Sequence, residues 1–157
     1  MSTEIIAVPG LASFPLIVYL HDNAIALAMV KAAHLLGVAL LIGPVILFDL
    51  RVLGAFSHLS VRALARATLP VAVTSLALIV PSGLAMFAVH SDNLLTNQTF
   101  ALKMGLVLVG GILAVVFHSG PYRHIRDEVG PTPIWARVLC ASSMLGWTAV
   151  VVLATTM

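Results

Sequence analysis

The sequence predicts an all-α membrane protein: one domain over residues 1–157, built as a bundle of four transmembrane helices after a short interfacial helix. Composition is the first indication. Of the 157 residues, 61% are hydrophobic and 9% are charged, whereas about a quarter of the residues in soluble domains are charged. The second is that the apolar residues gather into four runs of about 20 residues, the length that a helix needs to cross a bilayer. These runs leave no room for a soluble catalytic domain, so any chemistry must take place within or at the edge of the helices.

The chain starts with an apolar segment that is too interrupted to be a span. Residues 11–27 are broken by Pro15 and by a polar group around Asp22, which is typical of a short helix lying at the membrane interface. The first residues lack the basic region of a cleaved signal peptide, so we expect them to remain in the mature protein.

Four spans are expected, at about 28–50, 67–89, 99–118 and 138–157. Proline inside a helix removes a backbone hydrogen bond, so Pro44 in the first span and Pro81 in the second predict bends. Glycines at 105, 110 and 111 in the third span offer small surfaces for close helix packing.

Arginines set the expected orientation. They gather in the connections after the first and third spans, whereas the connection after the second contains no Lys or Arg. By the positive-inside rule both arginine-rich connections are cytoplasmic, and both termini are periplasmic in a bacterial inner membrane. The formal charge of +2 arises in these short loops and gives no indication of nucleic-acid binding. A single cysteine, Cys140, excludes an intrachain disulfide and a CxxCH haem attachment, and we expect it to be a buried thiol.

His34 is the ionisable residue inside the first span. An ionisable side chain facing lipid is costly, so His34 is expected to face protein, a cofactor or water. Counting residues from the arginines places His34 near other polar or sulfur-bearing side chains at the outer side of the membrane. This outer cluster comprises Lys31, His34, Met86, His90 and Lys103, with His21, Asp22 and Asp92 nearby. A second, inner group comprises Asp49, Arg51, His58, His118 and His124.

Three interpretations of the outer cluster remain open. It could hold haem b, with histidine nitrogens on the iron and Lys31 and Lys103 neutralising the propionates. It could bind copper through His34 and His90, with methionine as a soft ligand for Cu(I). Or each residue could be structural, with the lysines reaching headgroups and His34 bonding to a neighbouring helix.

Depth restricts how the histidines can pair. His34 and His118 lie ~20 Å apart in depth and cannot share one iron, so His118 would belong to a separate inner site. His34 and His90 differ by up to ~10 Å, which leaves open a shared metal, a single-histidine haem, or a pair of His34 with Met86.

For several other residues we expect structural roles. Arg51 is expected to extend to cytoplasmic headgroups and Asp49 to face a polar contact. Arg62 and Arg66, after an N-cap at Ser60, suit an amphipathic stretch on anionic lipid. Trp147, in the middle of the fourth span, is expected to pack in the core.

Four short motifs carry a resemblance to a known group of proteins. They are H-L-L-G at 34–37, D-L-R-V-L-G at 49–54, P-S-G-L-A-M-F at 81–87 and T-F-A-L-K at 99–103. Together they resemble a family of small uncharacterised bacterial four-helix inner-membrane proteins, which is similar to the membrane domain of the copper-resistance D group. The resemblance covers the first three spans and implies an inner-membrane bundle with a copper-handling or cytochrome-like role.

The residues thus favour a haem-binding electron-transfer or anchor subunit that is not itself catalytic. It would work with a periplasmic redox partner, other membrane subunits and quinone. The alternatives are a copper-binding or copper-permeation protein, and a cofactor-free structural subunit.

Overall fold

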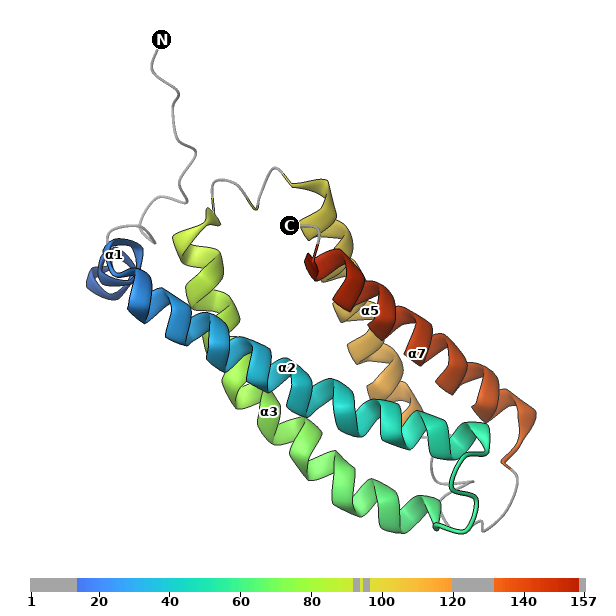
Figure 1. Ribbon diagram of the computed structural model, residues 1–157. Helices are drawn as coiled ribbons and strands as arrows, with labels where there is room; N and C mark the ends of the chain where they lie inside the picture. Colours follow the sequence, from blue (N-terminus) through green and yellow to red (C-terminus); the bar gives the residue numbers. More distant parts are fainter. Residues whose placement is uncertain (1–13, 92–93, 95–96, 120–131, 156–157) are drawn as a thin grey trace.

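The computed structural model describes residues 14–91, 94, 97–119 and 132–155, most of which are helical. The helices are α1 (Pro15–Asp22), α2 (Ala24–Leu53), α3 (Val61–Val89), α5 (Gln98–Ser119) and α7 (Ile134–Thr155) (Figure 1). The last four are each long and apolar enough to cross a membrane, and α1 is the short helix expected before them. The predicted all-α bundle is therefore confirmed, and the chain is a multi-pass membrane protein.

Local capping explains where α2 begins and ends. The side chain of Asn23 accepts hydrogen bonds from the backbone nitrogens of Ile25 and Ala26, which separates α2 from α1. At the other end Gly54 has a φ of 117°, a left-handed conformation that favours glycine. The nitrogen of Ala55 then bonds the carbonyl of Leu50 at 2.9 Å, which closes the helix.

The second span begins earlier than expected. The Oγ of Ser60 accepts a hydrogen bond from the nitrogen of Ala63 at 3.0 Å, so the predicted N-cap is confirmed. The helix that it starts is α3 itself, so Arg62 and Arg66 lie in the first turns of a span and not in a separate amphipathic segment. Both α2 and α3 run unbroken through their internal prolines, Pro44 in α2 and Pro70 and Pro81 in α3.

The spans are arranged in two pairs. Helix α2 packs along the length of α3, while α5 packs on α7, and α7 joins the pairs by packing on α2. Helix α1 lies across one end of the α2–α3 pair and contacts both helices (Figure 1).

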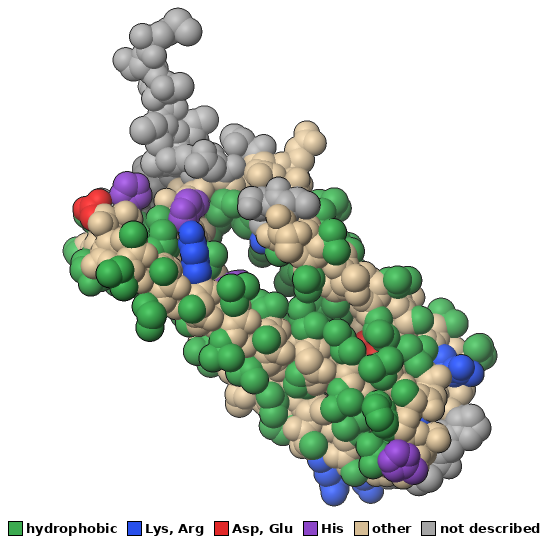
Figure 2. Space-filling model, viewed as in Figure 1, with side chains coloured by type: hydrophobic (Ala, Val, Ile, Leu, Met, Phe, Trp, Pro, Cys, Tyr) green, Lys and Arg blue, Asp and Glu red, His purple; other side chains and the backbone are tan. Residues whose placement is uncertain are grey.

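One end of the bundle is closed by an apolar core to which all four spans contribute. The core comprises Phe48, Val52, Val61, Ala65, Phe117, Ala136 and Cys140. It lies where α2 ends and α3 begins, and this region is called the closed end below. Towards the other end the pairs separate, and Figure 2 shows an opening between them. This region, with residues 30–37 of α2, 79–90 of α3 and 98–105 of α5, is called the open end.

The outer surface of the bundle is strongly apolar. Leu35 is 68% exposed, Val115 70% and Leu145 73%, although each lies well inside a span. Side chains of this kind are stable on the outside of a helix when they contact lipid tails. The exposed faces are therefore the surface that contacts the bilayer.

Candidate functional site

His34 lies at the open end with its ring held against α3. Its Nδ1 is 3.0 Å from the Oγ of Ser82, a residue that is only 8% exposed. A Cβ atom placed on Gly83 would lie 3.2 Å from the Cε1 of His34, so the ring rests directly on this glycine. The half-buried ring is thus fixed by a hydrogen bond on one side and by backbone on the other.

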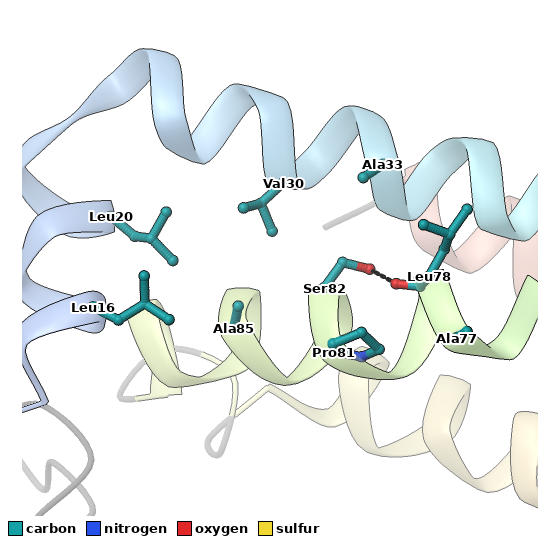
Figure 3. A pocket seen from close by; sticks show the side chains of 9 residues that line it. All are labelled: Leu16, Leu20, Val30, Ala33, Ala77, Leu78, Pro81, Ser82 and Ala85. Carbon is teal, nitrogen blue, oxygen red and sulfur yellow. Dashed lines mark hydrogen bonds between the residues drawn. The ribbon is translucent and has the colours of Figure 1, made fainter.

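The hydrogen bonds of Ser82 determine which nitrogen of His34 carries the proton. Ser82 donates its hydroxyl to the carbonyl of Leu78 (Figure 3), with the carbonyl of Ile79 also 3.2 Å away. A serine hydroxyl has one proton, so the Oγ must accept from Nδ1–H of His34. The Nε2 then bears the lone pair, and within the described residues it has no hydrogen-bond partner. In this tautomer a neutral imidazole can ligate a metal through Nε2.

A second glycine lets α2 and α3 come close enough for this arrangement. A Cβ atom on Gly37 would lie 2.8 Å from Cγ1 of Ile79 and 3.3 Å from its backbone nitrogen. Ile79 of α3 thus packs on Gly37 of α2, and His34 of α2 packs on Gly83 of α3. The H-L-L-G and P-S-G motifs therefore pack on each other.

Met86 and His90 follow Ser82 along α3. The carbonyl of Met86 accepts hydrogen bonds from both the backbone nitrogen and the Nδ1 of His90, each at 3.2 Å. Met86 is one turn from Ser82, ~6 Å along the helix, whereas His90 is eight residues away, ~12 Å. A metal shared by His34 and His90 would have to span this offset.

The two lysines lie on different helices. Lys103 of α5 places its Nζ 5.4 Å from the ring centre of Phe100. Phe100 in turn stacks on Phe87 of α3, with centroids 5.9 Å apart and an interplanar angle of 16°. This contact joins α5 to α3 near the opening. Lys31 is exposed on α2. Basic and histidine side chains are visible around the opening in Figure 2.

His118 is at the closed end, away from the rest of the predicted set. Its ring centre is 5.8 Å from that of Phe48, and its Nδ1 bonds the carbonyl of Ala114 at 2.8 Å. Phe48 is fourteen residues beyond His34 on α2, ~21 Å along the axis. The expectation that His34 and His118 cannot share one iron is confirmed.

Five other polar residues belong to the predicted outer and inner groups. His21 and Asp22 are 3.2 Å apart and both 72% exposed at the end of α1. His58 is exposed in the turn between α2 and α3. Asp92 and His124 lie outside the described residues.

The prediction for Arg51 is wrong. Instead of extending to headgroups, its side chain is fully buried, with Nε 2.6 Å from the carbonyl of Leu59 and a terminal nitrogen 3.2 Å from that of Ser57. The turn after α2 leaves these carbonyls facing inward, and a guanidinium can donate to both at once. Arg51 therefore fastens the connection between α2 and α3.

The expectation that Asp49 faces a polar contact is confirmed. Asp49 is 5% exposed and interacts with the side chains of Ser143 and Cys140 on α7, while its Oδ2 is buried without a hydrogen-bond partner. Cys140 is buried, as expected. The sequence shows that Asp49 is an acidic residue near the end of a span. No sequence pattern indicated that its partners would be Ser143 and Cys140 of the fourth span.

Trp147 packs between α5 and α7 but is only half-buried, so it lies outside the buried core that was expected for it. A Cβ atom on Gly110 of α5 would lie 3.4 Å from its ring, so this glycine admits the indole between α5 and α7. Gly105 and Gly111 have nothing within 4 Å of such an atom, so two of the three predicted small surfaces are not used for packing between the described helices.

A pocket of about 290 Å³ lies between α1, α2 and α3, behind Ser82 (Figure 3). Its lining is apolar except for Ser82 and comprises Leu16, Leu20, Val30, Ala33, Ala77, Leu78, Pro81, Ser82 and Ala85. The pocket therefore offers an apolar cavity with one hydroxyl group as its polar side chain.

The described residues contain no group of three or more His, Cys, Asp or Glu side chains placed to hold a metal ion. No family model, curated protein or solved structure matches this chain. The resemblance to the copper-resistance D group therefore remains an expectation from the sequence, and the functional argument depends on the site itself.

Proposed function

We propose that this chain is a b-type haem-binding subunit of a membrane electron-transfer complex, in which His34 would hold the haem iron. One observation carries the proposal. The hydrogen-bond chain from His34 through Ser82 to the Leu78 carbonyl holds the imidazole in one tautomer, in which Nε2 has no partner among the described residues. Histidine ligands in metal sites characteristically donate their other ring nitrogen to such a partner, which fixes the ring and raises its basicity.

The surroundings of His34 fit a planar anionic cofactor. The helix pairs separate at the open end, where Phe87 of α3 stacks on Phe100 of α5 and adds apolar side chains. Lys31 and Lys103 are the cations that would pair with the propionates. When bound, the haem would supply a one-electron redox centre within the membrane.

The positions of these residues favour a site with one histidine. His90 is ~12 Å from Ser82 along α3 and Met86 only ~6 Å, so Met86 is the better candidate for a second residue that would hold the haem. We place His90 at the rim of the site. His118, at the closed end, has no part in it.

The proposed partners follow from the proposed role. An electron-transfer subunit receives electrons from one molecule and passes them to another. We propose a periplasmic redox protein at the open end and quinone in the bilayer, in a bacterial inner membrane with both termini periplasmic. In this role the chain is an electron-transfer or anchor subunit and not an enzyme on its own.

The test is the visible spectrum and metal content of protein purified in mild detergent. A Soret band that sharpens and shifts on reduction, together with iron per chain near one, supports haem. His34→Ala should abolish both, because it removes the ligand, and should still insert. His58→Ala is the matched control, since His58 is an exposed histidine of the turn and should keep full haem content.

The remaining variants decide between the alternatives. His90→Ala should retain haem, and His118→Ala should retain it as well. Full haem content in His34→Ala would contradict the proposal. Stoichiometric copper without a Soret band would favour a copper-binding protein, and the absence of both would leave a structural subunit.

A further inference from the structure

The closed end contains a buried carboxyl group, distinct from the open-end site. Asp49 lies on α2 one turn before the end of that helix, between the core residues Phe48 and Val52. Only 5% of its surface is exposed, because α7 covers it. Its side chain faces Ser143 and Cys140 of α7.

No positive charge offsets this carboxyl within the described part of the chain. Its two side-chain partners, a hydroxyl and a thiol, are both neutral. Its Oδ2 is buried and has no hydrogen-bond partner among the residues that the structure describes. The neighbouring cation on the same helix, Arg51, directs its guanidinium to the carbonyls of Ser57 and Leu59.

The titratable groups on the surrounding helices do not supply a counter-charge either. From α7 the facing group is the thiol of Cys140, while the cation of that helix, Arg137, is exposed and not paired with Asp49. On α3, Arg66 is exposed and Arg62 is half-buried near the start of the helix, and neither is paired with Asp49. On α5, His118 packs its ring on Phe48. The ionisable groups of α1, His21 and Asp22, are exposed at the opposite end of the bundle.

From this geometry we infer that Asp49 is a membrane-embedded proton-binding site. A carboxylate in such surroundings would be an uncompensated buried charge, and a buried group in that position takes up a proton instead. The proton adds to the carboxyl group, for which Oδ2 is the free oxygen, and no other bond is made or broken. Release returns the proton to water and leaves the carboxylate.

The proton would be exchanged with the water at the closed end. Asp49 is four residues from Leu53, the last residue of α2, or ~6 Å along the axis. His34 is fifteen residues away on the same helix, ~22 Å. The inference therefore goes beyond the proposed haem site and does not depend on it.

Infrared spectroscopy of the purified protein in lipid nanodiscs tests the inference directly. A protonated carboxyl gives a C=O stretching band that is separate from the carboxylate bands and moves to lower frequency when the proton is replaced by deuterium. Wild type should show such a band, shifted in D₂O, and Asp49→Asn should lack it. Asp22→Asn, which alters the exposed acid of α1, should retain it.

Chemical modification of the wild-type protein provides a second measurement, which does not require a variant to fold. Dicyclohexylcarbodiimide adds to protonated carboxyls in apolar surroundings: the acid proton moves to one carbodiimide nitrogen, the oxygen bonds the central carbon, and the acyl group then migrates to nitrogen. No group leaves, so the adduct is a stable mass increase. We expect one adduct per chain on Asp49, with a yield that falls as pH rises.

Two results would overturn the inference. One is a C=O band that is absent from wild type, unchanged in Asp49→Asn, or unshifted in D₂O, because Asp49 would then be ionised or sealed from exchange. The other is a carbodiimide adduct that maps to another residue while Asp49 stays unmodified at every pH.

Discussion

Gly37 of α2 and Ile79 of α3 are so close that a Cβ atom on the glycine would lie 2.8 Å from Ile79 Cγ1. Lipid tails are as apolar as the side chains, so helices in a membrane associate through close packing of this kind. The contact fixes the register of α2 on α3, and that register places His34 opposite Ser82 and Gly83. The candidate site therefore depends on a glycine one turn away from it.

Gly37→Ala should destabilise the protein by about 1–3 kcal/mol, because the added methyl group meets both a side chain and the backbone of residue 79. The measurement is reversible unfolding in mixed micelles with increasing SDS. Gly43→Ala is the matched control on the same helix, where nothing lies within 4 Å of the added atom. Equal midpoints for the two variants would show that the close approach does not exist in the membrane.

Ser82→Ala should weaken haem binding by about 10–100-fold, because the ring of His34 loses the group that orients it. Haem titration of the apoprotein, followed at the Soret band, measures this. Ser75→Ala is a matched control: Ser75 is a buried serine of the same helix whose Oγ bonds only the carbonyl of Ala72 at 2.6 Å. If both variants bind haem like wild type, Ser82 does not support the ligand.

Arg51→Lys should lower the free energy of unfolding by about 1.5–3 kcal/mol, because an ammonium group cannot donate to the carbonyls of Leu59 and Ser57 as the guanidinium does. The same substitution at Arg66, which is exposed, should have an effect within about 0.5 kcal/mol. SDS unfolding midpoints give both values. A larger loss at Arg66 than at Arg51 would contradict the buried placement.

Topology can be tested with a membrane-impermeant maleimide on intact cells. A cysteine placed at Asn93 should be labelled from outside and one at Ala63 should not, since the arginine-rich connections are expected to be cytoplasmic. The native thiol should add little background, because Cys140 is only 3% exposed. Labelling at Ala63 with protection at Asn93 would invert the orientation and with it the proposed partners.

Residue patterns alone predicted several features correctly. The four spans, the short helix before them, the cap at Ser60 and the buried state of Cys140 each depend on a segment's own composition or on neighbours within one turn. The error at Arg51 has a different origin. Its depth suggested headgroups, but depth says nothing about the direction of a side chain, and the turn after α2 offers it carbonyls inside the protein.

The outer cluster shows the same limit. Sequence counting put Lys31, His34, Met86, His90 and Lys103 at related depths. The structure brings His34 onto Ser82 and Gly83, and it joins α5 to α3 through Phe87 and Phe100. Ser82, whose hydroxyl fixes the tautomer of His34, follows Pro81, where the sequence predicted a bend. No sequence pattern indicated that Ser82 would face His34.

The sequence by itself determined that this chain enters a membrane as four helices, because insertion depends on the summed hydrophobicity of each segment. Only the tertiary structure decided which side chains meet. Those meetings are fixed by the rotation and register of one helix on another, which glycines such as Gly37, Gly83 and Gly110 set through close packing. Such a contact depends on the side chains at one position in each of two segments that are far apart in the chain. It therefore cannot be predicted from either segment by itself.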